Sequence, residues 1–215
     1  MNNFQYVVKR SDRRSFCVRI LEDNTIIVNC PKRSGVEAIE KFLESKSGWI
    51  KRHLNDNNRK NEFLAEVISY RKVLVAGEPV PLHIDRCGDN FISFCEVWVK
   101  SQSCLKKLYI SEFSADFGKV IDDFCAQTSL FYRNYSFRDY KSRWGCCNLA
   151  GEIKFNWKLL MLPQEIWRYV IIHELCHTVY MNHSPRFYKL MSTFLPEYGN
   201  LKKELEKYSR IAKLY

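Results

Sequence analysis

The chain has 215 residues, of which 46% are hydrophobic and 14% are aromatic, and glycine and proline are sparse. This composition predicts a folded chain and excludes a disordered or low-complexity protein. The formal net charge of +10 would suit an anionic partner such as nucleic acid, but the basic residues are spread along the chain, which favours an ordinary basic surface.

The N-terminus and the cysteines favour a cytoplasmic protein. The opening residues MNNFQYVVKR lack the layout of a signal peptide, and no stretch is long and apolar enough to span a membrane. The nine cysteines have scattered spacings and no Cys-x-x-Cys pair, so we expect reduced thiols and neither a disulfide framework nor a thiolate zinc site. The sequence makes no prediction about the oligomeric state.

The first third of the chain predicts strands followed by a helix. Runs of β-branched and aromatic residues, FQYVV, SFCVRIL and TIIVNC, predict an antiparallel β-meander. Ser34 and Glu37 have the spacing of a capping box, and apolar residues then recur at helical spacing up to Leu54. The polar run NDNNRK that follows predicts the end of this helix.

From about residue 63 to residue 111 the pattern returns to short strands, VLVAG, PVPLHI, FISFCEVWV and KLYIS, which predicts a second hairpin system. A helix is expected next, with Ser111 or Ser114 as its N-cap and its end near Tyr132. We therefore expect one domain of residues 1–215. Its residues 1–111 would be mainly a β scaffold with one helix, and its residues 112–215 would carry the chemistry.

The last third predicts a hairpin followed by three helices. FRDYKSRWGCCNLAGEIKFNW reads as strand, turn and strand. Pro163 suits the first turn of an apolar helix, QEIWRYVIIHELCHTVY, because proline is tolerated there. Ser184 and Pro185 begin a further helix, and GNLKKELEKYSRIAKLY predicts a last, more exposed one.

The apolar helix carries the residues that indicate chemistry. His173 and His177 lie one turn apart and project from one face, with Glu174 beside them. Two imidazoles so placed can hold a zinc ion with an open position, and Glu174 can then act as general base on an activated water. Such polar groups are costly on a buried helix without a metal, so the pattern predicts a zinc site and hydrolysis.

A third zinc ligand is needed, and His183 is the nearest candidate. It can turn back toward the other two histidines only if the helix ends near Asn182, which tolerates the left-handed conformation, and Pro185 favours such an end. A downstream carboxylate, Glu197 or Glu204, is the alternative ligand.

Three further residues are candidates for contact with substrate or with an oxyanion: Arg143, Tyr180 and Tyr198. Packing roles are the alternative for each of them. Cys176, inside the histidine motif, is expected to be a small core residue because it is displaced from the histidine face.

The run SRWGCCNLAGEIKFNWKLLMLPQEIWRYVIIHELCHTVYMNHSPRFYKLM resembles the YgjP-like family of metal-dependent hydrolases, which is related to the SprT-like and WLM zinc metallopeptidases. The resemblance rests on Arg-Trp-Gly, Asn-Trp, His-Glu-x-x-His and Asn-His-Ser. It implies that His173, His177 and His183 are the zinc ligands and that Glu174 is the catalytic acid-base. The family has serine where this chain has Cys146, which puts a hydroxyl-specific role there in doubt.

The resemblance also implies an α+β, zincin-like fold. In it, antiparallel N-terminal strands and a helix precede an active-site helix flanked by a β-hairpin and C-terminal helices, and the hairpin edge can pair with an extended substrate. A metallopeptidase that acts on peptides or proteins is the leading hypothesis. The alternatives are a nucleotide phosphohydrolase, and a protease associated with nucleic acid through the aromatic and basic residues 132–141.

Overall fold

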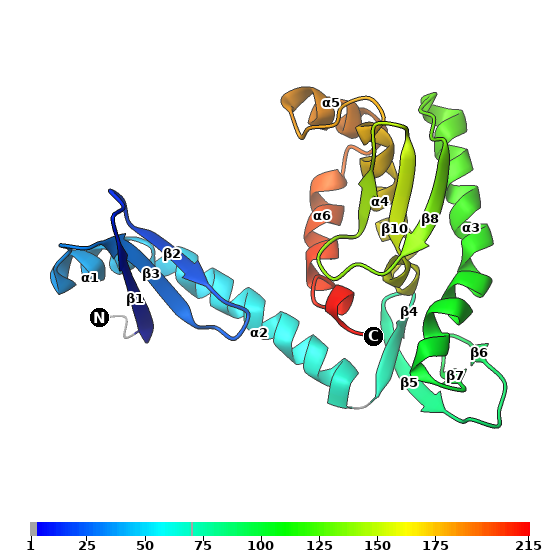
Figure 1. Cartoon of the computed structure of the whole chain (residues 1–215), viewed down its shortest axis with the longest axis horizontal. Coiled ribbons are helices and arrows are strands. Elements are labelled where there is room, and N and C mark those ends of the chain that lie inside the picture. The colour runs from blue at the N-terminus through cyan, green and yellow to red at the C-terminus, as the bar shows by residue number, and fades with distance from the viewer. Residues whose placement is uncertain (1–3, 70) are drawn as a thin grey trace. The chain divides into compact units, whose positions relative to one another are not determined.

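The computed structural model describes residues 4–69 and 71–215 and has a mixed α+β fold (Figure 1). The sequence predicts one domain of residues 1–215, and the structure has two compact units, one ending at Phe63 and one beginning at Leu64. All nine cysteines are free thiols, as expected. Within the described ranges, no helix combines the length and the apolar character needed to cross a membrane.

The first unit contains a three-stranded sheet in the order β1-β3-β2. Its strands are β1 (Tyr6–Ser11), β2 (Cys17–Ile20) and β3 (Ile26–Pro31). β1 pairs with β3 in parallel, so the predicted antiparallel meander is wrong for this pair. β3 takes the centre because its alternate residues Ile26, Val28 and Cys30 are all buried, and a central strand is the best place for such a face.

Two helices cover one face of this sheet, α1 (Val36–Ser45) and α2 (Ser47–Ser69). Ile39, Leu43 and Ile50 from the helices pack in one core cluster with the buried residues of β3. The predicted capping box does not form. Gly35 is the N-cap of α1 and no side chain caps the helix, so the Ser34 and Glu37 spacing is coincidental.

The polar run NDNNRK lies inside α2, so the predicted helix end there is wrong. One asparagine of this run and the asparagine that follows it bind the turn before β3. The Asn57 side chain donates to the Leu21 carbonyl at 2.8 Å, and the Asn61 side chain donates to the Glu22 carbonyl at 3.1 Å. These tertiary bonds satisfy side chains that would otherwise compete with the helical backbone.

The second unit begins with a four-stranded sheet in the order β4-β5-β7-β6. Its strands are β4 (Lys72–Val75), β5 (Glu78–Ile84), β6 (Phe91–Ile92) and β7 (Val97–Val99). The run FISFCEVWV therefore forms two short strands that pair with each other, where one strand was predicted. β5 and β7 are parallel, and the other two pairs are antiparallel.

The predicted strand KLYIS is wrong, because these residues belong to helix α3 (Leu105–Thr128), which follows the 3-10 turn η1 (Gln102–Cys104). Leu105, Leu108 and Tyr109 are buried at helical spacing, so the core selects a helix in spite of the local β propensity. The helix thus starts before Ser111. It ends at Thr128, where Ser129 takes the left-handed conformation with φ of 55°.

The predicted hairpin is confirmed in a third sheet, ordered β8-β10-β9. Its strands are β8 (Asn134–Arg138), β9 (Gly145–Cys147) and β10 (Glu152–Asn156). The Asn148 side chain accepts hydrogen bonds from the backbone N–H groups of Ala150 and Glu152, and Gly151 has φ of 73°, so this turn uses the chemistry that the sequence indicates. β9 is an edge strand.

The C-terminal helices also form largely as predicted, in the order η2 (Trp157–Met161), α4 (Gln164–His177), α5 (Pro185–Phe194), α6 (Tyr198–Lys207) and η3 (Ile211–Lys213). The Ser184 side chain caps α5 by accepting from the Phe187 N–H group. α4 packs against α3, β9, α5 and α6. It ends at His177, earlier than expected, and Asn182 is not among the residues with positive φ.

Phe117 on α3 is the centre of an aromatic cluster in the second unit. Its ring lies 4.9 Å from that of Phe155 and 5.5 Å from that of Trp167, between centroids. Because the side chain is fully buried, replacing it leaves a cavity that its rigid neighbours cannot fill.

We expect Phe117→Ala to lower the free energy of unfolding by about 3–5 kcal/mol, because both buried area and packing are lost. Phe131→Ala is the matched control, since Phe131 is 75% exposed; it should change the free energy by no more than about 0.5 kcal/mol. Denaturant titration measures both values. Equal effects of the two substitutions would contradict this account of the core.

Candidate metal centre

Helix α4 places two histidines and a glutamate at one end of a buried apolar helix. The residues around them, among them Ile172, Leu175 and Cys176, are fully buried, so Cys176 is the core residue that the sequence predicts. The rings of His173 and His177 lie one helical turn apart, with centroids separated by 4.9 Å. The helix therefore presents both imidazoles on one face.

His183 turns back to the same place. After α4 the chain turns within a few residues, with the Tyr180 N–H group bonded to the Cys176 carbonyl at 2.9 Å. The Nε2 atom of His183 then lies 3.1 Å from Nε2 of His173, and its ring centroid lies 4.8 Å from that of His177. One nitrogen from each of the three rings lies within 4.8 Å of the others.

The carboxylates that the sequence offers as alternative ligands lie elsewhere. Within residues 4–69 and 71–215, the group of side chains that converges here contains the three histidines and no carboxylate ligand. Glu197 is exposed, and Glu204 forms an ion pair with Lys207 at 2.6 Å. The geometry therefore favours His183 over either glutamate.

The imidazoles are held in orientation by their neighbours. The Nδ1 atom of His177 lies 3.0 Å from the Tyr180 carbonyl, and a bond there leaves Nε2 of His177 available to a metal. The buried ring of Phe187 lies 4.7–5.1 Å from all three imidazole rings, between centroids. Tyr180, a candidate for oxyanion contact, thus enters the site through its backbone carbonyl.

Glu174 is the other polar group of the site, and it is only 4% exposed. Burial raises the pKa of its carboxyl group to about 8, and the positive charge of Arg143 opposes this shift. Among the described residues, its Oε2 atom has no hydrogen-bond partner. A buried oxygen without a hydrogen-bond partner costs free energy, so the site is suited to an external ligand that would contact this oxygen.

Burial also acts on the histidines. It lowers the pKa of His173 to about 3, with further lowering by His177 and His183, so this imidazole is neutral. Burial likewise lowers the pKa of His177. Neutral imidazoles can ligate a metal, whereas protonated ones cannot.

Gly145, the first residue of β9, lies directly against Glu174. A Cβ atom at this position would lie 2.6 Å from Oε1 of Glu174, so any other residue there would force the Glu174 side chain to move. Arg143, two residues earlier, is exposed and close enough to influence the Glu174 carboxyl. The edge strand expected beside the active-site helix is therefore β9, which packs on α4.

The two cysteines of β9 point to different surroundings. The Cys146 Sγ atom lies 3.4 Å from the Tyr140 hydroxyl group. Burial, with a further contribution from Glu174, raises the pKa of the Cys147 thiol to about 11, so this thiol stays protonated. A thiol in this state is a poor metal ligand, which leaves the three imidazoles as the donor set.

Tyr198 does not touch the histidines directly but belongs to a stack of rings. Its ring centroid lies 6.0 Å from that of Tyr188, which lies 6.1 Å from that of His183. Sequence reasoning missed Tyr188 and Phe187. The signal that could have indicated them was the start of a helix at Ser184 and Pro185. Because this helix begins directly after His183, the residues of its first turn lie close to the histidines.

Half of the aromatic and basic segment 132–141 forms β8, and two of its rings face the core. Tyr135 and Phe137 pack around Phe117, with ring centroids 6.1 and 5.2 Å from it. The Tyr132 hydroxyl group donates to Asp122 at 3.1 Å. Because Tyr135 and Phe137 pack against the core, binding of nucleic acid there stays a prediction that the packing does not favour.

Three convergent imidazoles with a buried carboxyl group beside them form a site that fits a divalent metal ion. This is the arrangement of a metal-dependent hydrolase. The model of the YgjP-like metallopeptidase domain matches residues 14–208, and the chain therefore belongs to the YgjP-like family.

Part of the chain is also similar to a solved structure, the zymogen of the metallopeptidase abylysin from Pyrococcus abyssi. The TM-score is 0.39 and the sequence identity is 18%, and the match covers 41% of this chain and 90% of that one. No curated protein sequence matches the chain.

The buried carboxyl group makes the stability of the metal-free protein depend on pH. The folded protein binds the Glu174 proton more tightly than the unfolded chain does, since the pKa rises from 4.5 to about 8. The stability that the protonated Glu174 carboxyl group contributes is therefore fully present below pH 4.5 and is lost as the pH rises through 8. Glu174→Gln removes this loss, because the amide does not ionise.

We expect metal-free Glu174→Gln to gain stability relative to the metal-free wild type as the pH rises from 4.5 to about 8. Denaturant titrations with a chelator present, at several pH values, measure the difference. A difference that does not change with pH would contradict a raised pKa at Glu174.

Proposed function

We propose that the protein is a zincin-like zinc metallopeptidase. The observation that carries this proposal is the convergence of His173, His177 and His183 next to the buried carboxyl group of Glu174. Membership of the YgjP-like family supports hydrolysis by a metal-dependent enzyme. The zinc ion, the peptide substrate and the roles of single residues are the proposed parts.

Zinc is the ion that the donor set fits best. Imidazole nitrogens are ligands that zinc accepts, and three protein ligands leave one position of a tetrahedral site open to water or substrate. When bound, zinc would supply Lewis acidity, which polarises the scissile carbonyl group and makes a bound water easier to deprotonate. His177 would be kept in the ligating tautomer by its bond to the Tyr180 carbonyl.

Glu174 is the proposed general acid-base. Burial raises the pKa of its carboxyl group to about 8 in the metal-free protein, and a bound cation would lower it again by stabilising the carboxylate, which is the form that can accept a proton. It would accept a proton from the attacking water and pass it to the leaving amine nitrogen. Arg143, which is exposed beside it, could then contact the charge that develops on the carbonyl oxygen.

An extended peptide is the proposed substrate because of the place of β9. This strand pairs with β10 on one side only and packs against α4. A free strand edge offers backbone N–H and C=O groups to another extended chain. A peptide added there would run past the three imidazoles, with its carbonyl groups near Glu174.

The first test of this function combines metal analysis with activity. We expect about one zinc ion per purified chain, and we expect a chelator to abolish peptide cleavage, since the attacking water would no longer be activated. Glu174→Gln should keep the zinc and lose about 100- to 10,000-fold in kcat, because the general base is missing.

A nucleotide panel run in parallel distinguishes the phosphohydrolase alternative. Cleavage of nucleotides and not of peptides, lost in Glu174→Gln, would overturn the peptidase proposal while keeping the metal site. Full activity of Glu174→Gln on peptides would show that another group is the base.

The second test concerns the third ligand. We expect His183→Ala to weaken zinc binding strongly, because one of three nitrogen donors is lost, and competition with a coloured chelator measures the affinity. His53→Ala is the matched control, since His53 is an exposed histidine of α2 and should leave the affinity unchanged. Equal affinity of the wild type and His183→Ala would return the ligand role to a carboxylate such as Glu197 or Glu204.

A further inference from the structure

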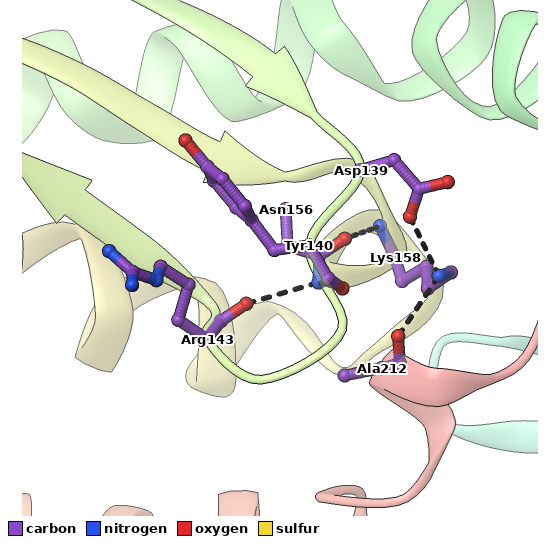
Figure 2. A network of polar contacts seen from close by, with 6 residues as sticks. All are labelled: Asp139, Tyr140, Arg143, Asn156, Lys158 and Ala212. Carbon is purple, nitrogen blue, oxygen red and sulfur yellow. Dashed lines mark hydrogen bonds and ion pairs between the residues drawn. The ribbon is translucent and has the colours of Figure 1, made fainter.

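Two buried polar residues hold the loop that leads into β9 (Figure 2). Asn156 ends β10 and Lys158 lies in the turn η2, and they are 0% and 1% exposed. Lysine is almost never buried without a partner, and a buried amide needs its hydrogen bonds, so each residue must have a reason to be there. Apart from one hydrogen bond between Asn156 and Lys158 themselves, their side chains bond to residues 139–143 and to the C-terminal turn.

The side chain of Asn156 closes the loop. Its amide nitrogen donates to the carbonyl of Tyr140 at 2.8 Å and to the carbonyl of Arg143 at 3.1 Å. Its oxygen accepts from the backbone N–H group of Lys158 at 3.3 Å. The two amide hydrogens of Asn156 thus bond to the two sides of one turn. A side chain with a single hydrogen-bond donor could not make both bonds.

Lys158 fixes the start of the same loop. Its ammonium group forms an ion pair with Asp139 at 2.8 Å and donates to the Ala212 carbonyl at 3.0 Å (Figure 2). Ala212 belongs to the last 3-10 turn, η3. The loop is therefore attached to β10 through Asn156 and to the C-terminal turn through Lys158.

The bonds to Asn156 hold the backbone from which the Tyr140 and Arg143 side chains project. The guanidinium carbon of Arg143 is 5.7 Å from the ring centroid of Tyr140, a distance at which a cation is attracted to the ring face. The Tyr140 hydroxyl group contacts Cys146 of β9. Asn156 binds the backbone carbonyls of both residues, and the charge of Arg143 acts on the Glu174 carboxyl group.

We infer that Asn156 and Tyr140 are positioning residues that aim the Arg143 guanidinium at the substrate, and that Lys158 anchors the loop in which they act. This inference rests on the proposed function, in which Arg143 meets the charge that develops on the scissile carbonyl. Asn156 and Lys158 act through the loop, because their bonds go to its backbone and to Asp139.

The test is a double-mutant cycle on the full-length, zinc-loaded protein. Arg143→Ala should lose about 100-fold in kcat, the usual effect of removing one group that stabilises developing charge. Asn156→Ala should lose between about 10- and 100-fold, as for outer residues that orient a functional group. In the Arg143→Ala background, Asn156→Ala should cause no further loss, because both act through the same guanidinium.

Tyr140→Leu should show the same dependence on Arg143, and it keeps the inference testable if Asn156→Ala does not fold. Asn148→Ala is the matched control: Asn148 is also an asparagine with several hydrogen bonds in this hairpin, but it binds the far turn. Its kcat should equal that of the wild type. Losses from Asn156→Ala and Arg143→Ala that simply multiply would show a general structural role and overturn the inference.

Amide hydrogen exchange separates this inference from the proposed function. We expect faster exchange in residues 139–144 of Asn156→Ala than in those of the wild type or Asn148→Ala, since the bonds that close the loop are gone. Unchanged exchange would overturn the inference even with full peptidase activity. If the wild type and Glu174→Gln are equally inactive on peptides, the proposed function fails, while the exchange result still decides whether Asn156 holds the loop.

Discussion

The close approach of Gly145 to Glu174 is the constraint on which the rest of the site depends. A methyl group at position 145 would lie 2.6 Å from the carboxyl oxygen, so glycine at this position is what lets the Glu174 side chain keep its place against β9. Glu174 is buried at this contact, and β9 is the edge strand of its sheet. The contact therefore joins the proposed acid-base group to the strand edge proposed for substrate.

The same packing makes the metal-free site unfavourable. Glu174 lacks a partner for one oxygen within the described residues, and burial shifts the pKa of Glu174 upward and that of His173 downward. Both groups are thus held in their neutral forms by an apolar helix end. A divalent cation would reverse this cost, because it binds neutral imidazoles and stabilises a nearby carboxylate. Stability and function would then depend on the same ion.

Local signals in the sequence were enough for the hairpin at Asn148, for α4 and for the cap of α5, since turn residues, helical spacing and a serine cap act over a few residues. They failed where distant contacts decide. The parallel pairing of β1 with β3, the asparagines of α2 that bind the 21–24 turn, and the burial of Leu105 are all tertiary. The three histidines lie within eleven residues of one another, so their spacing in the sequence was enough to predict them. Phe187 and Asn156 join the site through tertiary contacts, and they were not predicted as parts of it.

Lys158 shows what such tertiary residues contribute. Removing an ammonium group from water costs free energy, and an ion pair with the half-exposed Asp139 does not offset that cost. An apolar residue of similar size would therefore give a protein of equal stability. What an apolar residue could not do is bind Asp139 and the Ala212 carbonyl at once. The ammonium group fixes one arrangement of the loop among many compact ones. For the proposed role of Arg143, that single arrangement of the loop matters more than additional stability.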